Sequence, residues 1–271
     1  IKNIIDNSNS DYIVFIGKDI ELMPFTLYEL VKSIEYRDSI LIYSDNDKMI
    51  NGQRIKPHFK PGFARDTIIS QNYIGRFIAV KTTFLKIHKE MLENLNKDII
   101  YDILLQVSEK TRKIEHIQKI LYHETEENMN IDIVDEKKII EKHLKRMNLE
   151  YDNIQDGRFK GQYKINYKIK GNPLISLVIP NMDHIEDLDK LLKSLEKSTY
   201  SNYEAIIVEN NSKNKETFEY YDKIIQKDKR IKVFKYDINY FNYSAIVNYG
   251  VECSNGEYVV MLNNDIEFIT T

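Results

Sequence analysis

The chain has 271 residues, of which 42% are apolar and 30% charged, and its net charge at pH 7 is −3. This composition is ordinary for a folded chain of one or two domains, and it excludes the basic excess typical of proteins that bind nucleic acid. The lone cysteine, Cys253, excludes an intrachain disulfide, and no apolar run reaches the 18 or more residues of a membrane-spanning helix. With no signal-peptide pattern after Ile1, we expect a cytoplasmic location.

The first predicted strand carries a motif that returns near the end of the chain. "SNSDYIVFIGKDIEL" at residues 8–22 aligns without gaps with "SNGEYVVMLNNDIEF" at residues 254–268, an offset of 246 positions. That offset is far longer than the repeat of a solenoid and is close to the length of a whole domain. We therefore expect this chain to be cut from a longer tandem of related domains.

Several polar residues mark the ends of predicted elements between residues 40 and 125. Asp45 and Asp47 close a strand-like run in "YSDNDK", and His123 closes a later one in "LYH". Asp102 begins a helical pattern in "IIYDILLQVSE". Each of these residues also has a purely structural interpretation. Asp45 and Asp47 could lie in a solvated turn, and His123 could be a structural histidine. Asp102 could be a helix N-cap or an acid of the first helical turn.

Residues 126–171 lack such polar strand ends, and we predict them to be a linker. "DIVDEKKIIEKHLKRMNLE" has apolar residues at helical spacing, and "GRFKGQYKINYKIKGNP" alternates like an exposed two-stranded element or an extended connector. The apolar positions of the helix are Ile133, Val134, Ile139, Ile140, Leu144 and Met147. A solvated face is the simplest interpretation of the basic, tyrosine-bearing run, and contact with a polyanionic glycan or a membrane is the alternative.

The last hundred residues predict a β-α-β-α-β order. "PLISLVIP" at residues 173–180 is a nearly unbroken apolar run, typical of a strand that is buried on both faces. A helical pattern, the strand "YEAIIVENNS", a helix at residues 216–228 and the strand "IKVFKYD" follow it. This alternation predicts a mostly parallel α/β sheet flanked by helices, in which ligands bind beyond the carboxyl ends of the strands.

Polar clusters stand at three of those strand ends, in "IPNMDH", "VENNS" and "LNNDIE". Each cluster alone has the composition of a turn. Together the three clusters could hold the base, the ribose and a phosphate-bound cation of a nucleotide. No G-x-G-x-x-G follows the first strand and no G-x-x-x-x-G-K-[ST] occurs, which disfavours a dinucleotide-binding or P-loop fold. The residues in question are Pro180, Asp183, Glu209, Asn211, Asn263 and Asp265.

These motifs resemble a known family. "SLVIPNMD", "IIVENNS" and "FNYSAIVNYGVECSNGEYVVMLNNDIE" are similar to the nucleotide-binding half of inverting family 2 glycosyltransferases with the GT-A fold. "SDYIVFIGKDIELMP", "QNYIGRF" and "YDILLQVSEKTRKIEHIQKILYH" resemble the acceptor-binding half of the same subgroup, the tandem bacterial enzymes that build O-antigen, capsule or rhamnan chains. The resemblance implies that residues 1–125 are the acceptor-side half of one domain and that residues 172–271 are the nucleotide-binding half of the next.

The resemblance also implies roles for the marked residues. Asp183 and Glu209 match the acids that contact base and ribose, and Asp102 matches the catalytic base. Asp45, Asp47, Asn72, Tyr73 and Gly75 match residues near the acceptor or donor sugar, although Tyr73 could equally serve packing. The implied donor is a UDP- or dTDP-sugar and the implied acceptor is a growing surface glycan, with no role for nucleic acid. Peripheral membrane association and a homodimer that exchanges half-domains are further expectations.

The expected metal site departs from the family pattern. The Asp-x-Asp motif that holds Mn²⁺ or Mg²⁺ in the family is Gly17-Lys18-Asp19 in the first copy and Asn263-Asn264-Asp265 in the second, so one carboxylate remains in each. Asp19, Asp265 and His123 are the candidate metal ligands, and we expect weak metal binding without a nucleotide. The alternative function is therefore a non-catalytic GT-A-like module that binds a nucleotide or a glycan, or that spaces domains.

Overall fold

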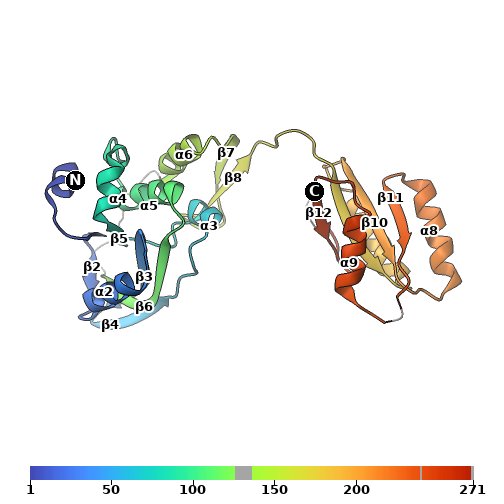
Figure 1. The fold of residues 1–271 in the computed structure, drawn as a ribbon, viewed down its shortest axis with the longest axis horizontal. Helices are drawn as coiled ribbons and strands as arrows, with labels where there is room; N and C mark the ends of the chain where they lie inside the picture. Colours follow the sequence, from blue (N-terminus) through green and yellow to red (C-terminus); the bar gives the residue numbers. More distant parts are fainter. Residues whose placement is uncertain (126–135, 239, 270–271) are drawn as a thin grey trace. The chain divides into compact units, whose positions relative to one another are not determined.

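The chain folds into two compact units, Ile1–Lys168 and Ile169–Thr271. The computed structural model describes residues 1–125, 136–238 and 240–269, and Figure 1 colours them along the chain. Each unit is an α/β structure with its own sheet and its own hydrophobic core.

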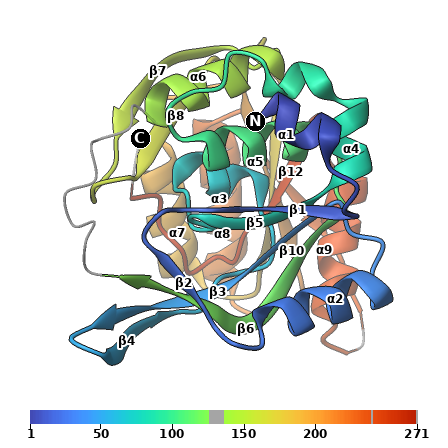
Figure 2. The same cartoon turned by 90° about the vertical axis from the view of Figure 1, so that its left-hand side faces the viewer.

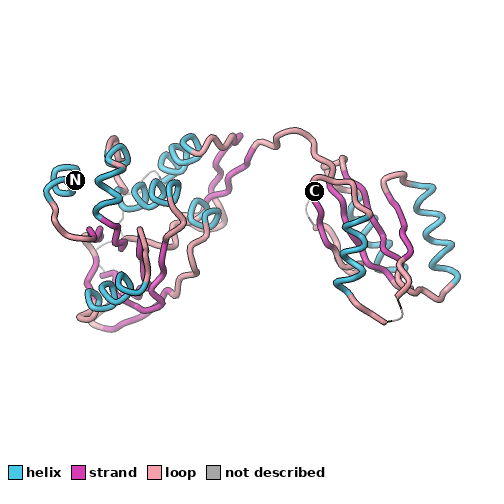
Figure 3. The backbone as a smooth tube through the Cα atoms, in the orientation of Figure 1, coloured by secondary structure: helices cyan, strands magenta, loops and turns pink. Residues whose placement is uncertain are grey.

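The second unit is built on a four-stranded parallel sheet in the order β11-β10-β9-β12. Its strands are β9 (Ile175–Asn181), β10 (Tyr203–Glu209), β11 (Ile231–Lys235) and β12 (Tyr258–Met261). Helices α7 (Ile185–Leu195) and α8 (Lys215–Lys227) share an apolar core with one face of the sheet, and α9 (Tyr243–Glu252) packs on the other face (Figure 3). The predicted β-α-β-α-β order and parallel sheet are confirmed here.

The central strands of this sheet are apolar on both sides, which explains why helices cover both faces. All residues of β10 are buried, including Ile206 and Val208 on the α9 side and Ile207 on the α7 side. Strand β12 differs, because all four of its residues are exposed and it lies at the edge of the sheet (Figure 1).

The first unit contains a six-stranded mixed sheet in the order β1-β5-β3-β6-β2, with β4 paired to β3. The strands are β1 (Tyr12–Ile16), β2 (Ile20–Leu22), β3 (Leu41–Ile50), β4 (Gln53–His58), β5 (Phe77–Lys81) and β6 (Ile114–Thr125). Only β3 and β6 run parallel, so the expectation of a mostly parallel sheet does not extend to this unit. One physical reason is the β3-β4 hairpin, whose turn residues Asn51 and Gly52 both have positive φ (Figure 2).

Helices cover both faces of this sheet. Helix α2 (Thr26–Tyr36) packs on one face through Leu30. The other face carries the larger core, which includes residues of α3 (Arg65–Ser70), α4 (Thr82–Ile87) and α5 (Ile99–Lys110). Helix α1 (Lys2–Asn7) and the short 3-10 helix η1 (Lys89–Leu92) contribute Ile5, Met91 and Leu92 to that same core.

The predicted linker is largely part of the first unit, which corrects our expectation. Helix α6 (Glu136–Arg146) buries Ile139, Ile140 and Leu144 in the large core, and β7 (Tyr151–Asp156) pairs with β8 (Tyr163–Tyr167). An amphipathic helix must bury its apolar stripe, and the core beside α5 receives it. The expected helical positions Ile133 and Val134 lie outside the described residues. Lys168–Leu174 is all that separates β8 from β9.

Candidate functional site

A pocket opens at the carboxyl ends of the strands in the second unit. Its volume is about 240 Å³. The lining residues come from the ends of β9, β10 and β12 and from the start of α9: Pro180, Asn181, Met182, His184, Asn210, Phe241, Tyr243, Ile246, Asn263 and Asn264. Amide groups and aromatic rings therefore converge where a parallel sheet binds its ligands. Of the residues predicted for the nucleotide, Pro180 and Asn263 line this pocket.

Asp183 hydrogen-bonds the loop that leads into helix α8. Its backbone has a φ of 57°, and its carboxylate accepts hydrogen bonds from Lys213 N (2.9 Å), Asn214 N (3.0 Å) and Thr217 Oγ1 (2.9 Å). The hydrogen bond from Lys213 N is the largest of the causes that lower the pKa of Asp183. The carboxylate thus fixes the loop beside the pocket, and a nucleotide would have to share it with these donors.

The Glu209 side chain hydrogen-bonds to residues of its own unit. Its side chain is buried and accepts hydrogen bonds from Ser212 N (2.6 Å), Ser212 Oγ (2.6 Å) and Tyr221 Oη (2.7 Å). Asn211, with a φ of 64°, donates from Nδ2 to Ile238 O at 2.8 Å. Both residues shape the loop after β10, and their predicted roles toward a ribose stay predictions.

Sequence reasoning singled out Asn263 but missed the other three amides that line the pocket, Asn181, Asn210 and Asn264. Asn181 donates to Tyr221 Oη (2.7 Å) and accepts from Asn264 Nδ2 (2.7 Å), which ties the ends of β9 and β12 together. Asn210 donates to Tyr236 O at 2.9 Å. Their positions directly after apolar strands were a usable signal, because such positions meet at one edge of a parallel sheet.

Three predicted acidic residues of the first unit, Asp19, Asp45 and Asp47, are paired with cations or imidazoles. Arg76 Nη1 contacts both carboxylate oxygens of Asp19, at 2.9 and 3.0 Å. Asp45 accepts from Lys60 N (2.8 Å) and contacts His116 Nε2 (2.7 Å). Asp47 accepts from Arg54 Nε (2.7 Å) and contacts His123 Nδ1. Asp45, Asp47 and His123 are buried, so the structure brings them together as two neighbouring carboxylate–imidazole pairs on β3 and β6.

A buried lysine lies beside these pairs. Lys60 Nζ donates to Ser44 O (2.7 Å), Ile74 O (2.7 Å) and Tyr122 Oη (2.8 Å). Burial lowers the pKa of Lys60 to about 7. Lys60 was not among the predicted site residues, although a lysine directly before Pro61 in "HFKPGF" was visible in the sequence.

Asp102 lies in the first turn of α5, and its side chain is 2% exposed. Oδ2 accepts from Asn96 N (2.9 Å) and Asn96 Nδ2 (2.7 Å), and Oδ1 accepts from Gln106 Nε2 (3.1 Å). Asp98, not Asp102, is the N-cap, because its side chain accepts from Tyr101 N. This geometry favours the structural alternative, in which Asp102 holds the loop before α5 in place.

The segment "QNYIGRF" forms a tight turn. Asn72 Oδ1 accepts from Gly75 N at 3.1 Å, and the Tyr73 hydroxyl accepts from Ala64 N at 2.9 Å. Gly75 has a φ of 80°, and a Cβ there would lie 3.2 Å from Tyr122 Oη. The buried Tyr73 ring serves packing, as the alternative for that residue held.

The candidate metal ligands do not form a site made by protein alone. Within residues 1–125, 136–238 and 240–269, no three His, Cys, Asp or Glu side chains come together as they would around a metal ion. Asp19 is held by Arg76 and His123 by Asp47, while Asp265 is exposed in the turn after β12. A divalent cation would thus depend on ligands from elsewhere, such as the phosphates of a nucleotide.

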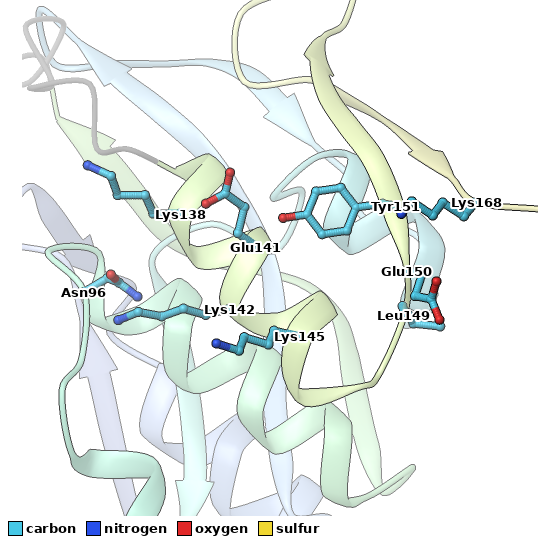
Figure 4. A pocket seen from close by; sticks show the side chains of 9 residues that line it. All are labelled: Asn96, Lys138, Glu141, Lys142, Lys145, Leu149, Glu150, Tyr151 and Lys168. Atoms are coloured by element: carbon cyan, nitrogen blue, oxygen red, sulfur yellow. The ribbon is translucent and has the colours of Figure 1, made fainter.

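A hollow of the first unit lies away from these residues, on α6. Its volume is about 620 Å³. In Figure 4, Lys138, Lys142 and Lys145 extend from α6 toward the side of Asn96, and Tyr151 and Lys168 belong to the β7-β8 hairpin on the other side. Only Lys168 of this lining belongs to the basic, tyrosine-bearing run at residues 157–173, for which contact with a polyanion was the alternative to a solvated face.

Comparison with known proteins gives a direct family match over the second unit. The family described as glycosyl transferase family 2 matches residues 176–270. The match covers most of the second unit and about a third of the whole chain.

Two relatives match the chain along nearly its whole length. It is 31% identical to the uncharacterized protein y4gI of Sinorhizobium fredii over 98% of the chain and 31% of that protein. It is 29% identical to the O-antigen biosynthesis protein RfbC of Myxococcus xanthus over 96% of the chain and 21% of that protein. The chain therefore spans about a third or less of these relatives.

Solved structures with partial likeness include two glycosyltransferases. S. aureus TarS in complex with UDP-GlcNAc is 22% identical, with a TM-score of 0.31 over 34% of this chain and 26% of that one. The mannosyltransferase PcManGT of Pyrobaculum calidifontis, in complex with GDP-Man and Mn²⁺, is 14% identical, with a TM-score of 0.33 over 48% of this chain and 35% of that one. Across the part of the chain that the structure describes, no helix is both long and apolar enough to cross a membrane.

Proposed function

We propose that this chain is part of an enzyme that transfers a sugar from a nucleotide-sugar donor, a UDP- or dTDP-sugar, to a growing surface glycan with inversion. The pocket at the carboxyl ends of β9, β10 and β12 carries the proposal, because it gathers amides and aromatic rings at the ligand-binding edge of a parallel sheet. Phe241 and Tyr243 offer apolar surface to a base, and Asn181, Asn210 and Asn264 offer amide groups at the same place. The proposed location is the cytoplasm, with peripheral contact to the inner membrane face.

The chemistry sets what the remaining residues would have to do. In an inverting transfer the acceptor hydroxyl attacks the anomeric carbon from the face opposite the diphosphate, and a carboxylate accepts its proton. Asp102 is the proposed base by resemblance, although its buried hydrogen bonds favour a supporting role. Since the described residues offer no protein-only metal site, we derive no step through a metal ion.

Isothermal calorimetry of the full chain with UDP and dTDP, each with and without Mn²⁺, tests the nucleotide site. We expect binding that Asn210→Ala and Asn264→Ala weaken at least several-fold. Asn202→Ala is the matched control, because Asn202 is an amide of the same unit that hydrogen-bonds Asn172 O outside the pocket. If neither nucleotide binds at millimolar concentration in the presence of Mn²⁺, the proposal fails.

The second candidate function is a non-catalytic GT-A-like module. The pairing of Asp19 with Arg76 favours it for the first unit, because that carboxylate is already neutralised by a guanidinium. Hydrolysis of nucleotide sugars by the longer parent protein separates the two functions. Nucleotide binding without any turnover would assign this chain to the non-catalytic class.

A further inference from the structure

Lysines outnumber acidic residues in the lining of the hollow on α6. The charged residues of this lining are Lys138, Lys142, Lys145, Lys168, Glu141 and Glu150. The three lysines of α6 are spaced at i, i+4 and i+7, so they lie on one face of the helix. Like charges at this spacing repel one another and lower the stability of a helix. The local excess of positive charge also stands in a chain whose net charge is −3, so helix stability and overall composition do not account for it.

Other cations of α6 are neutralised by carboxylates, and these pairs hold the walls of the hollow in place. Lys137 Nζ lies 2.9 Å from Asp156 Oδ1 and so links α6 to β7. Arg146 donates to Glu109 of α5 twice, from Nη2 to Oε1 at 2.7 Å and from Nε to Oε2 at 2.9 Å. Walls that are fixed before a ligand arrives lower the entropy cost of binding.

The lysines at the hollow itself differ in this respect. Lys142, Lys145 and Lys168 are exposed, and none of the three makes an ion pair with the residues that the structure describes. Lys142 Nζ donates only to a neutral group, Asn94 O, at 3.1 Å. A concave surface lined by an excess of one charge concentrates its electric field and attracts ions of the opposite sign. The hollow is therefore suited to a negatively charged ligand.

The other polar groups of the lining narrow the class of anion. The Glu141 carboxylate, the Asn96 amide and the Tyr151 hydroxyl can form hydrogen bonds with hydroxyl groups. In Figure 4 the Tyr151 ring extends from β7 with its hydroxyl toward α6, so its faces offer apolar surface beside the lysines. A bare polyanion would gain from the lysines alone and would be repelled by Glu141. A ligand that carries both hydroxyl and carboxylate groups would use the whole lining.

We propose that this hollow binds an acidic oligosaccharide, a short run of sugars that carry carboxylate groups. Lys142, Lys145 and Lys168 bind the carboxylates, while Glu141 and Asn96 bind the sugar hydroxyls. The volume of about 620 Å³ lies within the range of roughly 300–1,000 Å³ that is usual for small-molecule sites. The site belongs to the first unit alone and does not depend on nucleotide binding by the second unit.

Isothermal calorimetry of the full chain with trigalacturonate at low ionic strength tests the site. Lys142→Gln with Lys145→Gln should weaken binding roughly fivefold, because exposed charge pairs each contribute modestly and glutamine preserves helix propensity. Lys32→Gln with Lys197→Gln is the matched control, since both are exposed lysines outside the hollow, and it should bind like wild type. Added NaCl should weaken binding to the wild-type chain. Circular dichroism checks that both double variants fold.

Two further probes separate the charge of the ligand from its sugar rings. Methyl-esterified trigalacturonate keeps the rings and hydroxyls but loses the negative charge, so it should bind about fivefold more weakly or worse. Inorganic pyrophosphate has a similar charge without sugar hydroxyls and should also bind more weakly than trigalacturonate. The absence of trigalacturonate binding at millimolar concentration, or equal affinity in Lys142→Gln with Lys145→Gln and in wild type, would overturn the proposal. Pyrophosphate that binds as tightly as trigalacturonate would overturn it as well.

A membrane surface is the competing partner for exposed lysines, and sedimentation with phosphatidylserine vesicles tests it. Vesicle binding that Lys142→Gln with Lys145→Gln abolishes and that trigalacturonate does not displace would assign the hollow to lipid and overturn the proposal. Asn210→Ala, expected to weaken nucleotide binding, should leave trigalacturonate affinity unchanged because Asn210 lines the pocket of the second unit. The glycan site and the nucleotide site can thus fail separately.

Discussion

The Lys60 ammonium donates its hydrogen bonds to neutral oxygens, those of Ser44, Ile74 and Tyr122, although it is buried. Burial lowers the pKa of Lys60 from 10.5 to about 7, so between these values the unfolded chain binds a proton that the folded chain does not. The free energy of unfolding should therefore rise with pH across this window, by roughly 5 kcal/mol at most, and be independent of Lys60 below it. Urea unfolding at several pH values measures the slope, and Lys60→Met should flatten it. An equal slope in the variant would assign the effect to other groups.

The variant Asp102→Asn tests whether the Asp102 carboxylate has a structural or a catalytic role. The amide would direct donors at Asn96 N and Asn96 Nδ2, both of which donate to Asp102 Oδ2, and we expect a loss of about 1–3 kcal/mol in unfolding free energy. Asp66→Asn, at a residue in the first turn of α3, is the control and should be nearly neutral. Unchanged stability together with lost transfer in the parent protein would instead support Asp102 as the base.

At the scale of elements, Glu204 joins the amino ends of three strands and a loop. It accepts from Ser176 Oγ (2.6 Å) on β9, Lys232 Nζ (2.6 Å) on β11 and Asn255 N (2.6 Å) before β12. Burial alone would raise the pKa of Glu204, but these hydrogen bonds hold it at about 2. The stabilisation is present above pH 4.5 and is lost as the pH falls toward 2.

Glu204→Gln should accordingly reduce the acid sensitivity of the second unit. We expect the variant to lose on the order of 2 kcal/mol of unfolding free energy at pH 7. Residue 204 should then contribute almost no pH dependence to stability between pH 4.5 and 2. Acid titration followed by tyrosine circular dichroism measures the difference. Glu216→Gln, in the first turn of α8, is the matched control, and equal acid midpoints for Glu204→Gln and wild type would refute the assignment.

The elements that sequence predicted best were those with a strong local pattern. β9, α7, β10, α8 and β11 all follow from apolar runs and helical spacing, whereas α6 was predicted as a helix but assigned to a linker. The place where α6 packs depends on a core formed by residues more than thirty positions away, such as Tyr101, and no local sequence pattern reveals that core. The same limit applies to the site: strand-end clusters were visible, but Arg76, which pairs with Asp19, and His123, which contacts Asp47, come from distant segments.

At the scale of the whole molecule, the two units carry complementary parts of one expected domain. The second unit offers the pocket and the exposed Asp265, and the first offers the carboxylate–imidazole pairs of Asp45 and Asp47.

Metal binding by the full chain should reflect this incompleteness. With a single exposed carboxylate, Asp265, and no protein-only cluster among the residues that the structure describes, Mn²⁺ alone should bind only weakly, at millimolar concentration. A nucleoside diphosphate supplies further oxygen ligands, so UDP should tighten Mn²⁺ binding at least tenfold. Asp265→Asn should abolish this coupling, whereas Asp19→Asn should leave it intact because Arg76 already neutralises Asp19. Electron paramagnetic resonance of free Mn²⁺ measures both constants. Coupling that depends on Asp19 and not on Asp265 would place the metal in the first unit and reverse the assignment of the two repeats.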